Sequence, residues 1–464
     1  MVSSIHNMPR SNTQDFLAGV IEGFYGPPWA QSERFQLFEW MAQWGLNTYF
    51  YCPKDDCKQR AIWRTPYSPD EAETLRETIA ACTRQQIQFV YAISPGLDIR
   101  YSDPSEIEQL QNRFLQVMGL GCQHVALLFD DIPDRMDPSE LARCGSLASA
   151  QASIANNLFR WLRNRTPGAR LLFCPTPYCS RMANGHLGGK GYLDTLGKEL
   201  TQGIDVLWTG PEIISREITV AHVQEMGSVL RRRPMIWDNL HANDYDGRRF
   251  YCGPYAGRPL ELRDWVSGIL TNPNTEFPLN YIPFRTLARF VQASDPWDAR
   301  AEYLNALQEW SKHFETCTQP IATEDLRRLL DCFYLPHEDG PEAAAFLLEG
   351  QQLFEMDPQL WGARALAFRT NAARLRDTCA RMTELRERPL FYAMHRRLWE
   401  LREELDLLEK YVGFRSGHVD PAALFGSDFH LPQTYRGSFT ARLQRLLSQT
   451  ADGAMIPTQT APAD

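Results

Sequence analysis

The chain has 464 residues, of which 44% are hydrophobic and 23% charged, the composition of a folded globular protein. It is longer than a single compact domain of usual size, so two folded units are expected. The formal net charge of −9 and the sequence pI of about 5.7 exclude a typical nucleic-acid-binding protein, which needs a basic surface.

The N-terminal segment, the apolar runs and the cysteines indicate the compartment of the protein. Residues 1–15 are polar without the apolar core of a signal peptide, and no apolar run is long enough to span a bilayer. The eleven cysteines include no CxxC pair, which is typical of free thiols in a reducing compartment. The sequence predicts a cytoplasmic protein with no membrane partner and a disordered segment at residues 1–15.

Short β-rich segments alternate with amphipathic helices in the first part of the chain. Ser32 is expected to cap the first helix, and Pro69 to open the second. Eight such repeats over residues 16–295 predict an α/β fold, a (β/α)8 TIM-like barrel, because an open doubly wound sheet usually has fewer strands. The candidate strands are LAGVIEGF from Leu17, TYFYCP from Thr48, QFVYAISP from Gln88, HVALLFDD from His124, RLLFCPT from Arg170, DVLWTG from Asp205, PMIWDN from Pro234 and GILTNPN from Gly268.

Helical periodicity replaces the strand pattern after Ala293. Residues 296–447 are predicted to form an all-α stalk or bundle, and residues 448–464, poor in bulky apolar side chains, a disordered tail. One apolar stripe recurs at 3-4-3-4 spacing and fits either an intramolecular bundle or a seam with a partner chain. It comprises Leu398, Leu401, Leu405, Leu408 and Val412.

Polar and glycine residues gather at the carboxyl ends of the candidate strands, as in EGFYG, CPKDD and WDNLHANDYD. In a barrel these ends meet on one face, where barrel enzymes place their active sites. The fourth strand runs through five apolar residues directly into Asp130 and Asp131. The pair could simply end the strand as a turn or a cap, or it could be catalytic.

Adjacent strand residues point to opposite faces, so Asp130 and Asp131 fit poorly as an acid and a nucleophile that flank a sugar ring. They fit better if the substrate supplies the nucleophile, as the amide oxygen of a 2-acetamido sugar does. One carboxylate would then bind the amide N–H and the other would protonate the leaving oxygen. Their proximity is expected to raise the pKa of one of them.

Eight strand-end segments together resemble those of glycoside hydrolase family 84, the O-GlcNAcases, over about residues 16–295. The resemblance implies a retaining exo-β-N-acetylglucosaminidase that works by substrate assistance through an oxazoline intermediate and needs no cofactor. The segments are GVIEGFYGPPW, YCPKDD, YAISPGLD, ALLFDDIP, FCPTPYC, LWTGP, WDNLHANDYD and LTNPN.

By this resemblance, Asp130 orients the acetamido group and Asp131 is the general acid and then the general base. Tyr178 hydrogen-bonds the acetamido oxygen. Taken singly, the remaining candidates also fit turns, caps, surface or core positions. The substrate-binding candidates are Gly23, Lys54, Trp237, Asn239, Asp244, Tyr245 and Asn272.

No metal site is predicted. The segment ANDYDGRRF does not fit a calcium loop, and no Cys/His cluster has zinc spacing.

Residues from about Asp325 to Leu447 resemble the helical stalk of animal-type O-GlcNAcases, which implies a homodimer through the helical domain. The expected substrate is GlcNAc linked to Ser or Thr of proteins. A glycan, chitin-fragment or hyaluronan-like substrate remains an alternative, and a catalytically silent sugar-binding scaffold on the same barrel is a remote one.

Overall fold

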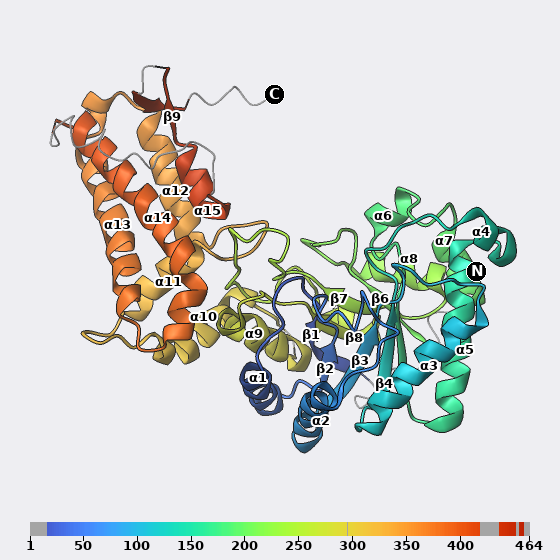
Figure 1. The fold of residues 1–464 in the computed structure, drawn as a ribbon. Helices are drawn as coiled ribbons and strands as arrows, with labels where there is room; N and C mark the ends of the chain where they lie inside the picture. Colours follow the sequence, from blue (N-terminus) through green and yellow to red (C-terminus); the bar gives the residue numbers. More distant parts are fainter. Residues whose placement is uncertain (1–15, 295, 418–435, 452–453, 459–464) are drawn as a thin grey trace. The chain divides into compact units, whose positions relative to one another are not determined.

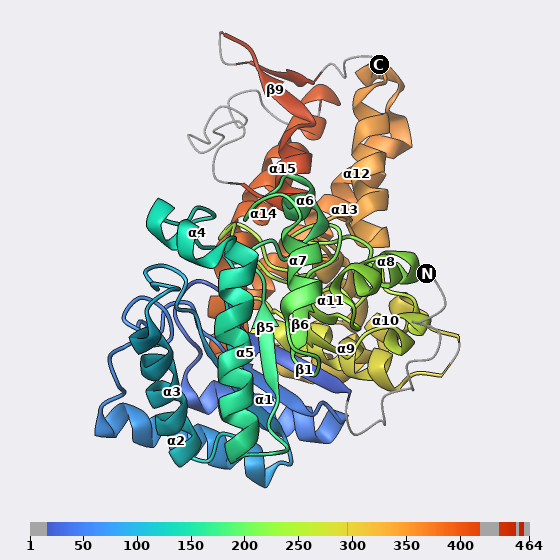
Figure 2. The ribbon, with the colours of Figure 1, turned by 90° about the vertical axis from the view of Figure 1, so that its right-hand side faces the viewer.

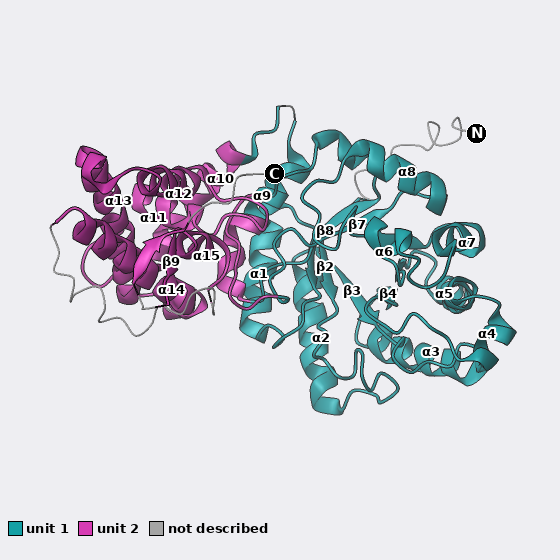
Figure 3. Cartoon of the chain, turned by 90° about the horizontal axis from the view of Figure 1, so that it is seen from above, with its two compact units in different colours: residues 1–245, 255–275, 284–299 teal, residues 246–254, 276–283, 300–464 magenta. Residues whose placement is uncertain are grey.

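The computed structural model describes residues 16–294, 296–417, 436–451 and 454–458. The chain divides into two compact units (Figure 3): residues 1–245, 255–275 and 284–299 form the first, and residues 246–254, 276–283 and 300–464 form the second. The sequence placed 246–254 and 276–283 in the barrel, whereas both group with the helical unit. The segment 1–15, predicted to be disordered, lies outside the described residues.

The first unit is a closed barrel of eight parallel strands in sequence order, which confirms the predicted fold (Figure 1). Each strand pairs with the next, and β1 closes the barrel by pairing with β8. The strands are β1 (Leu17–Glu22), β2 (Thr48–Tyr51), β3 (Gln88–Ile93), β4 (His124–Leu128), β5 (Leu171–Cys174), β6 (Asp205–Trp208), β7 (Met235–Asp238) and β8 (Gly268–Thr271).

Helices α1–α8 surround these strands (Figure 3), and α5 and α7 pack side by side on the outside (Figure 2). Their bounds are α1 (Gln31–Trp44), α2 (Pro69–Arg84), α3 (Pro104–Gly119), α4 (Pro138–Cys144), α5 (Leu147–Arg165), α6 (Ser180–Asn184), α7 (Tyr192–Glu199) and α8 (Val220–Leu230), and α9 (Tyr281–Gln292) follows β8.

The first two helices begin differently. The prediction of Ser32 as the cap of α1 is wrong, because Ala30 is the cap and the Glu33 carboxylate accepts its backbone N–H at 2.8 Å. A glutamate at the third helical position can supply this half of a capping box even where the cap has no polar side chain. Helix α2 begins at Pro69, as expected.

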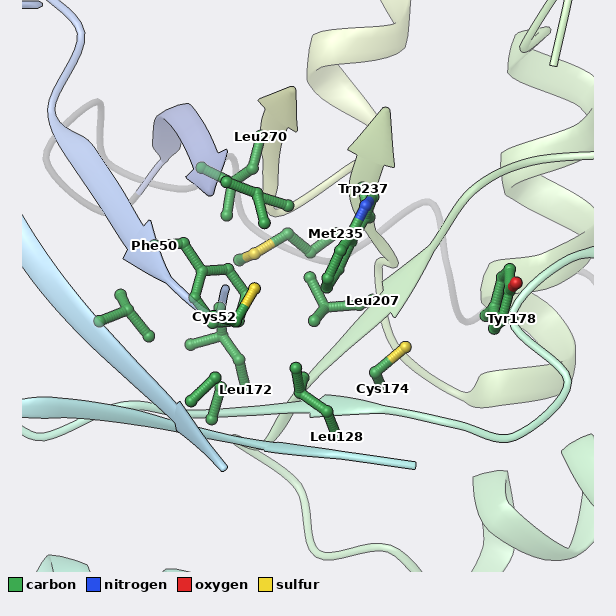
Figure 4. Packing of buried hydrophobic residues seen from close by; sticks show 14 of the residues in the cluster. Phe50, Cys52, Leu128, Leu172, Cys174, Tyr178, Leu207, Met235, Trp237 and Leu270 are labelled. Carbon is green, nitrogen blue, oxygen red and sulfur yellow. The ribbon is translucent and has the colours of Figure 1, made fainter. Parts of the chain in front are cut away.

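Apolar side chains that point inward fill the barrel (Figure 4). Gly19 allows the closest strand approach, because a Cβ there would lie 1.8 Å from the carbonyl oxygen of Thr48. The cluster includes Leu17, Ile21, Phe50, Cys52, Val90, Ala92, Ala126, Leu128, Leu172, Cys174, Tyr178, Cys179, Leu207, Met235, Trp237 and Leu270.

The second unit is mostly helical. The apolar stripe of α14, from Leu398 to Val412, is buried inside this unit, so the intramolecular interpretation holds and the stripe is not a seam with a partner. Part of the tail that was predicted to be disordered, within the described residues 448–451 and 454–458, is ordered, because β9 pairs antiparallel with β10. The elements are α10 (Ala299–Trp310), α11 (Thr323–Asp331), α12 (Pro341–Phe354), α13 (Gly362–Arg381), α14 (Arg388–Arg415), α15 (Ser438–Gln444), β9 (Leu447–Gln449) and β10 (Met455–Pro457).

Over the described residues, no helix combines the length and the apolar character that crossing a membrane requires.

Candidate active site

The two adjacent aspartates lie just beyond β4, in different surroundings. Asp130 is 5% exposed, whereas Asp131 is exposed. The backbone of Asp131 is left-handed, with φ of +51°. This conformation interrupts the alternation of a strand, and aspartate is one of the few non-glycine residues that adopt it readily. The change of backbone direction therefore separates a buried carboxylate from an exposed one.

Asp130 forms a buried ion pair with Lys54, which follows β2. The Lys54 Nζ donates to Asp130 Oδ2 at 2.5 Å, and the side chains are 2% and 8% exposed. The other oxygen, Oδ1, is buried and has no hydrogen-bond partner within the described part of the chain. A buried acceptor of this kind is costly unless a donor is supplied.

The pKa of Asp130 is lowered, so this carboxyl is not the one whose pKa the proximity of the two aspartates was expected to raise. Burial, the largest single effect, would raise the pKa of Asp130, but the charge and hydrogen bond of Lys54, together with the charge of Arg60, lower it overall. Conversely, burial opposes the charge on Lys54, and the Asp130 carboxylate raises its pKa overall. Asp130 is therefore held as an anion with one oxygen available.

Two phenols hold the carboxylate of Asp131. Tyr178, which follows β5, donates to Oδ1 at 2.8 Å, and Tyr25, which follows β1, donates to Oδ2 at 3.0 Å. Burial and then the Asp131 charge raise the pKa of Tyr178, and burial raises that of Tyr25 to about 12. Both phenols therefore keep their protons and remain donors.

A chain of amides joins the ends of β7 and β8. Asn239 Oδ1 accepts hydrogen bonds from Trp237 Nε1 and Asn272 Nδ2, both at 3.0 Å, and its Nδ2 donates to the carbonyl of Ile213. Asn272 Oδ1 is buried and lacks a partner among the described residues. This oxygen can accept a hydrogen bond from a sugar hydroxyl.

Gly23 and Trp237 are in direct contact. A Cβ on Gly23 would lie 2.7 Å from the Trp237 ring, so a larger residue would displace the indole. The ring also packs on Phe50 and lies 5.7 Å from the Lys54 ammonium. Trp237 is thus partly a core residue, as Figure 4 shows, with one face toward the ion pair.

The loop after β7 contributes the last two candidates. Asp244 is half-buried and accepts the Tyr25 backbone N–H at 2.9 Å, while burial raises its pKa. Tyr245 is 50% exposed. The structure therefore connects Asp244 to Asp131 through Tyr25 and leaves the Tyr245 ring on the surface.

Comparison with known proteins gives a consistent result. The sequence profile of the β-N-acetylglucosaminidase family matches residues 18–331. The mouse and rat proteins named protein O-GlcNAcase are each 46% identical over 279 residues, which are 60% of this chain and 30% of theirs. A solved structure of a mutant O-GlcNAc hydrolase from Thermobaculum terrenum superimposes with a TM-score of 0.77 at 27% identity, over 86% of this chain and 84% of that one.

The chain belongs to the β-N-acetylglucosaminidase family. This result confirms the family that the strand-end segments predicted and the glycosidase class that it implies. The aligned region spans about 30% of the length of the mammalian relatives.

Sequence reasoning missed two members of this site. Tyr25 lies within the EGFYG segment, whose glycine rather than its tyrosine was singled out. Arg60 donates to the backbone carbonyl of Asp131 at 2.7 Å, 71 positions away, and no local pattern marks it.

Metal ligands do not gather anywhere in the described ranges, where no group of three or more His, Cys, Asp or Glu residues could hold an ion.

The ion pair predicts a pH-dependent stability change in Lys54→Met. Removing one partner of a buried pair costs about 3–5 kcal/mol, because the other charge stays buried. Without Lys54, burial raises the pKa of Asp130 above its unfolded value, so the penalty is full at pH 8 and shrinks as the pH falls to 5 and Asp130 binds a proton. Urea unfolding at both pH values measures the free energy.

Two variants control this experiment. Lys198→Met removes an exposed ion pair with Asp194 and should change stability by less than about 0.5 kcal/mol. Lys54→Met/Asp130→Asn should recover much of the loss, since neither charge of the pair remains. An equal penalty for Lys54→Met at the two pH values would contradict the ion-pair account.

Proposed function

We propose that this protein is a retaining exo-β-N-acetylglucosaminidase that removes O-linked GlcNAc from Ser and Thr of proteins by substrate-assisted catalysis. The observation that carries the proposal is the unpartnered buried oxygen of Asp130. An acetamido N–H is a donor of the kind this oxygen lacks, and family membership makes a 2-acetamido sugar the natural substrate.

In the first step, Asp130 accepts the acetamido N–H and turns the amide oxygen toward the anomeric carbon. As the amide oxygen attacks, positive charge develops on the amide, and the adjacent anion stabilises it. Lys54 keeps Asp130 ionised and fixes its other oxygen. Asp130 therefore serves as an orienting and stabilising group, and the product of this step is the oxazoline.

Asp131 donates a proton to the glycosidic oxygen as the bond breaks, and later takes a proton from the water that opens the oxazoline. Its exposure gives the leaving group and the water access. Tyr178 donates to Asp131 in the structure, so its predicted bond to the acetamido oxygen requires the phenol to change acceptor when the sugar binds.

The remaining candidates would surround the sugar. Asn272 offers a free amide oxygen, Asn239 fixes Asn272 and Trp237, and Asp244 would accept from outer hydroxyls. Gly23 leaves room for the Trp237 ring. Tyr245, exposed beside Asp244, would form an outer wall, since sugar C–H faces pack on aromatic rings.

A protein aglycone is favoured because the mammalian relatives are named protein O-GlcNAcase and the bacterial structure is titled O-GlcNAc hydrolase. Hydrolysis of a GlcNAc-serine peptide, compared with a chitin disaccharide at equal concentration, decides between this aglycone and a glycan. Faster release from the disaccharide would favour the glycan.

The cytoplasm is the compartment we propose. All eleven cysteines are free thiols, and nine of them are wholly or partly buried. Free thiols persist in a reducing compartment. Fractionation of the source cells tests the assignment.

We expect a homodimer through the helical unit. Tyr392 and Trp399, seven residues apart on one side of α14, are 59% and 57% exposed, a large apolar area for a free surface. Light scattering should give twice the chain mass for the wild type and the single mass for Tyr392→Ser/Trp399→Ser. Leu360→Ser, at an exposed position outside this face, should stay dimeric; a monomeric wild type would refute the dimer.

Replacing either aspartate should give a distinct kinetic result. Asp131→Ala should lower kcat/KM about 100-fold or more for aryl β-GlcNAc substrates with poor leaving groups, and much less for activated ones, because activated groups need no proton. Asp130→Asn should slow both kinds of substrate by about 100-fold, since attack by the amide oxygen is impaired in each. Steady-state kinetics with both substrate types measures this.

Equal losses in Asp131→Ala on poor and activated leaving groups would remove its role as the general acid. Near-normal turnover by Asp130→Asn would remove the orienting role of that carboxylate.

A further inference from the structure

The backbone of Asp131 has an unfavourable conformation that contacts with other residues must stabilise. Asp131, with φ of +51°, is one of the few described non-glycine residues with a positive φ. Left-handed conformations of this kind cost about 1 kcal/mol or more. Such a conformation persists where surrounding contacts fix it. The two phenols bind only the carboxylate, so they do not by themselves fix the peptide group.

Arg60 supplies the contact to the backbone. Its Nη2 donates to the Asp131 carbonyl at 2.7 Å. Arg60 is 7% exposed, and no ion pair of Arg60 with a carboxylate is found in the described ranges. Burying a cation without an ion-pair partner is costly, so a surface or stabilising role explains this position poorly.

One loop carries both cationic side chains that contact the aspartate pair. Lys54 and Arg60 are six residues apart after β2; the first binds the Asp130 carboxylate and the second the Asp131 carbonyl. Arg60 also lowers the pKa of Asp130, after the larger effect of Lys54. The loop therefore contacts both aspartates, Asp130 at its carboxylate and Asp131 at its backbone carbonyl.

The loop itself is anchored at two residues that precede Arg60, Asp56 and Gln59. The Asp56 carboxylate accepts hydrogen bonds from the Tyr51 and Tyr67 hydroxyls at 2.8 and 2.7 Å. Gln59 binds Ser94, at the end of β3, through both backbone and side chain. These anchors give Arg60 a fixed place from which to hold Asp131.

We propose that Arg60 is a positioning residue that keeps Asp131 in the left-handed conformation and so aims its carboxylate at the glycosidic oxygen. Tyr25 complements Arg60 at the carboxylate, because its hydroxyl holds Asp131 Oδ2 and its ring lies 6.0 Å from the Arg60 guanidinium. The inference rests on the proposed role of Asp131 as the general acid. Without Arg60, the backbone relaxes and proton delivery suffers, while attack by the amide oxygen does not.

The test is the dependence of kcat/KM on the acidity of the leaving phenol in a series of aryl β-GlcNAc substrates. Arg60→Met should lose about 100-fold on the least acidic phenol and less than about 3-fold on the most acidic one, the result of misplacing an acid by about 1 Å. Arg64→Met is the matched control, because Arg64 lies four residues further on and pairs with Asp98 and Glu106. It should leave the dependence unchanged.

A uniform loss across the series in Arg60→Met would overturn the inference, since a purely structural role affects all substrates alike. If that variant does not fold, Arg60→Gln, whose shorter amide cannot take the place of the guanidinium, is measured in the same way and judged by the same criterion. Asp131→Ala separates the two claims. If kcat/KM of Asp131→Ala depends steeply on the acidity of the leaving phenol while Arg60→Met loses activity uniformly, only the positioning role of Arg60 is rejected. If kcat/KM of Asp131→Ala does not depend on that acidity, the role of Asp131 as the general acid is rejected.

Discussion

The buried ion pair between Lys54 and Asp130 is the interaction on which the site depends. A carboxylate at 5% exposure would normally take up a proton, and Lys54 prevents this by lowering its pKa. Because the ammonium occupies only Oδ2, the pair leaves Oδ1 as an anionic acceptor inside the barrel mouth. Barrel closure makes the pair possible, since it brings the ends of β2 and β4 to one face.

The backbone turn at Asp131 then gives two identical residues different environments. Asp130 belongs to the barrel interior, with Cys52 and Cys174 near it, whereas Asp131 faces solvent and is held by hydroxyls. In the proposed mechanism, environment rather than residue type separates the acid from the stabilising anion, as in other paired carboxylates. In this chain a single left-handed residue creates the difference, and the loop from Lys54 to Arg60 contacts both sides of it.

The sequence predicted the barrel well, because strand periodicity and strand-end polar residues are local signals. Contacts between residues far apart in the sequence were harder to predict. The stripe from Leu398 to Val412 showed an apolar face but not what covers it, and the structure buries it within its own unit. Likewise, the adjacent carboxylates suggested repulsion, and only the fold brings Lys54 to Asp130. Arg60 was unpredictable because a side chain that binds a peptide carbonyl 71 residues away leaves no pattern.

In the proposed mechanism the substrate's amide oxygen is the nucleophile, and Asp130 orients it. The most direct measurement is the hydrolysis rate of aryl β-GlcNAc substrates that carry zero to three fluorines on the N-acetyl methyl. Fluorine withdraws electrons from the amide oxygen, so kcat/KM should fall steeply with each fluorine. An unchanged rate across the series would contradict it and would require a nucleophile on the enzyme.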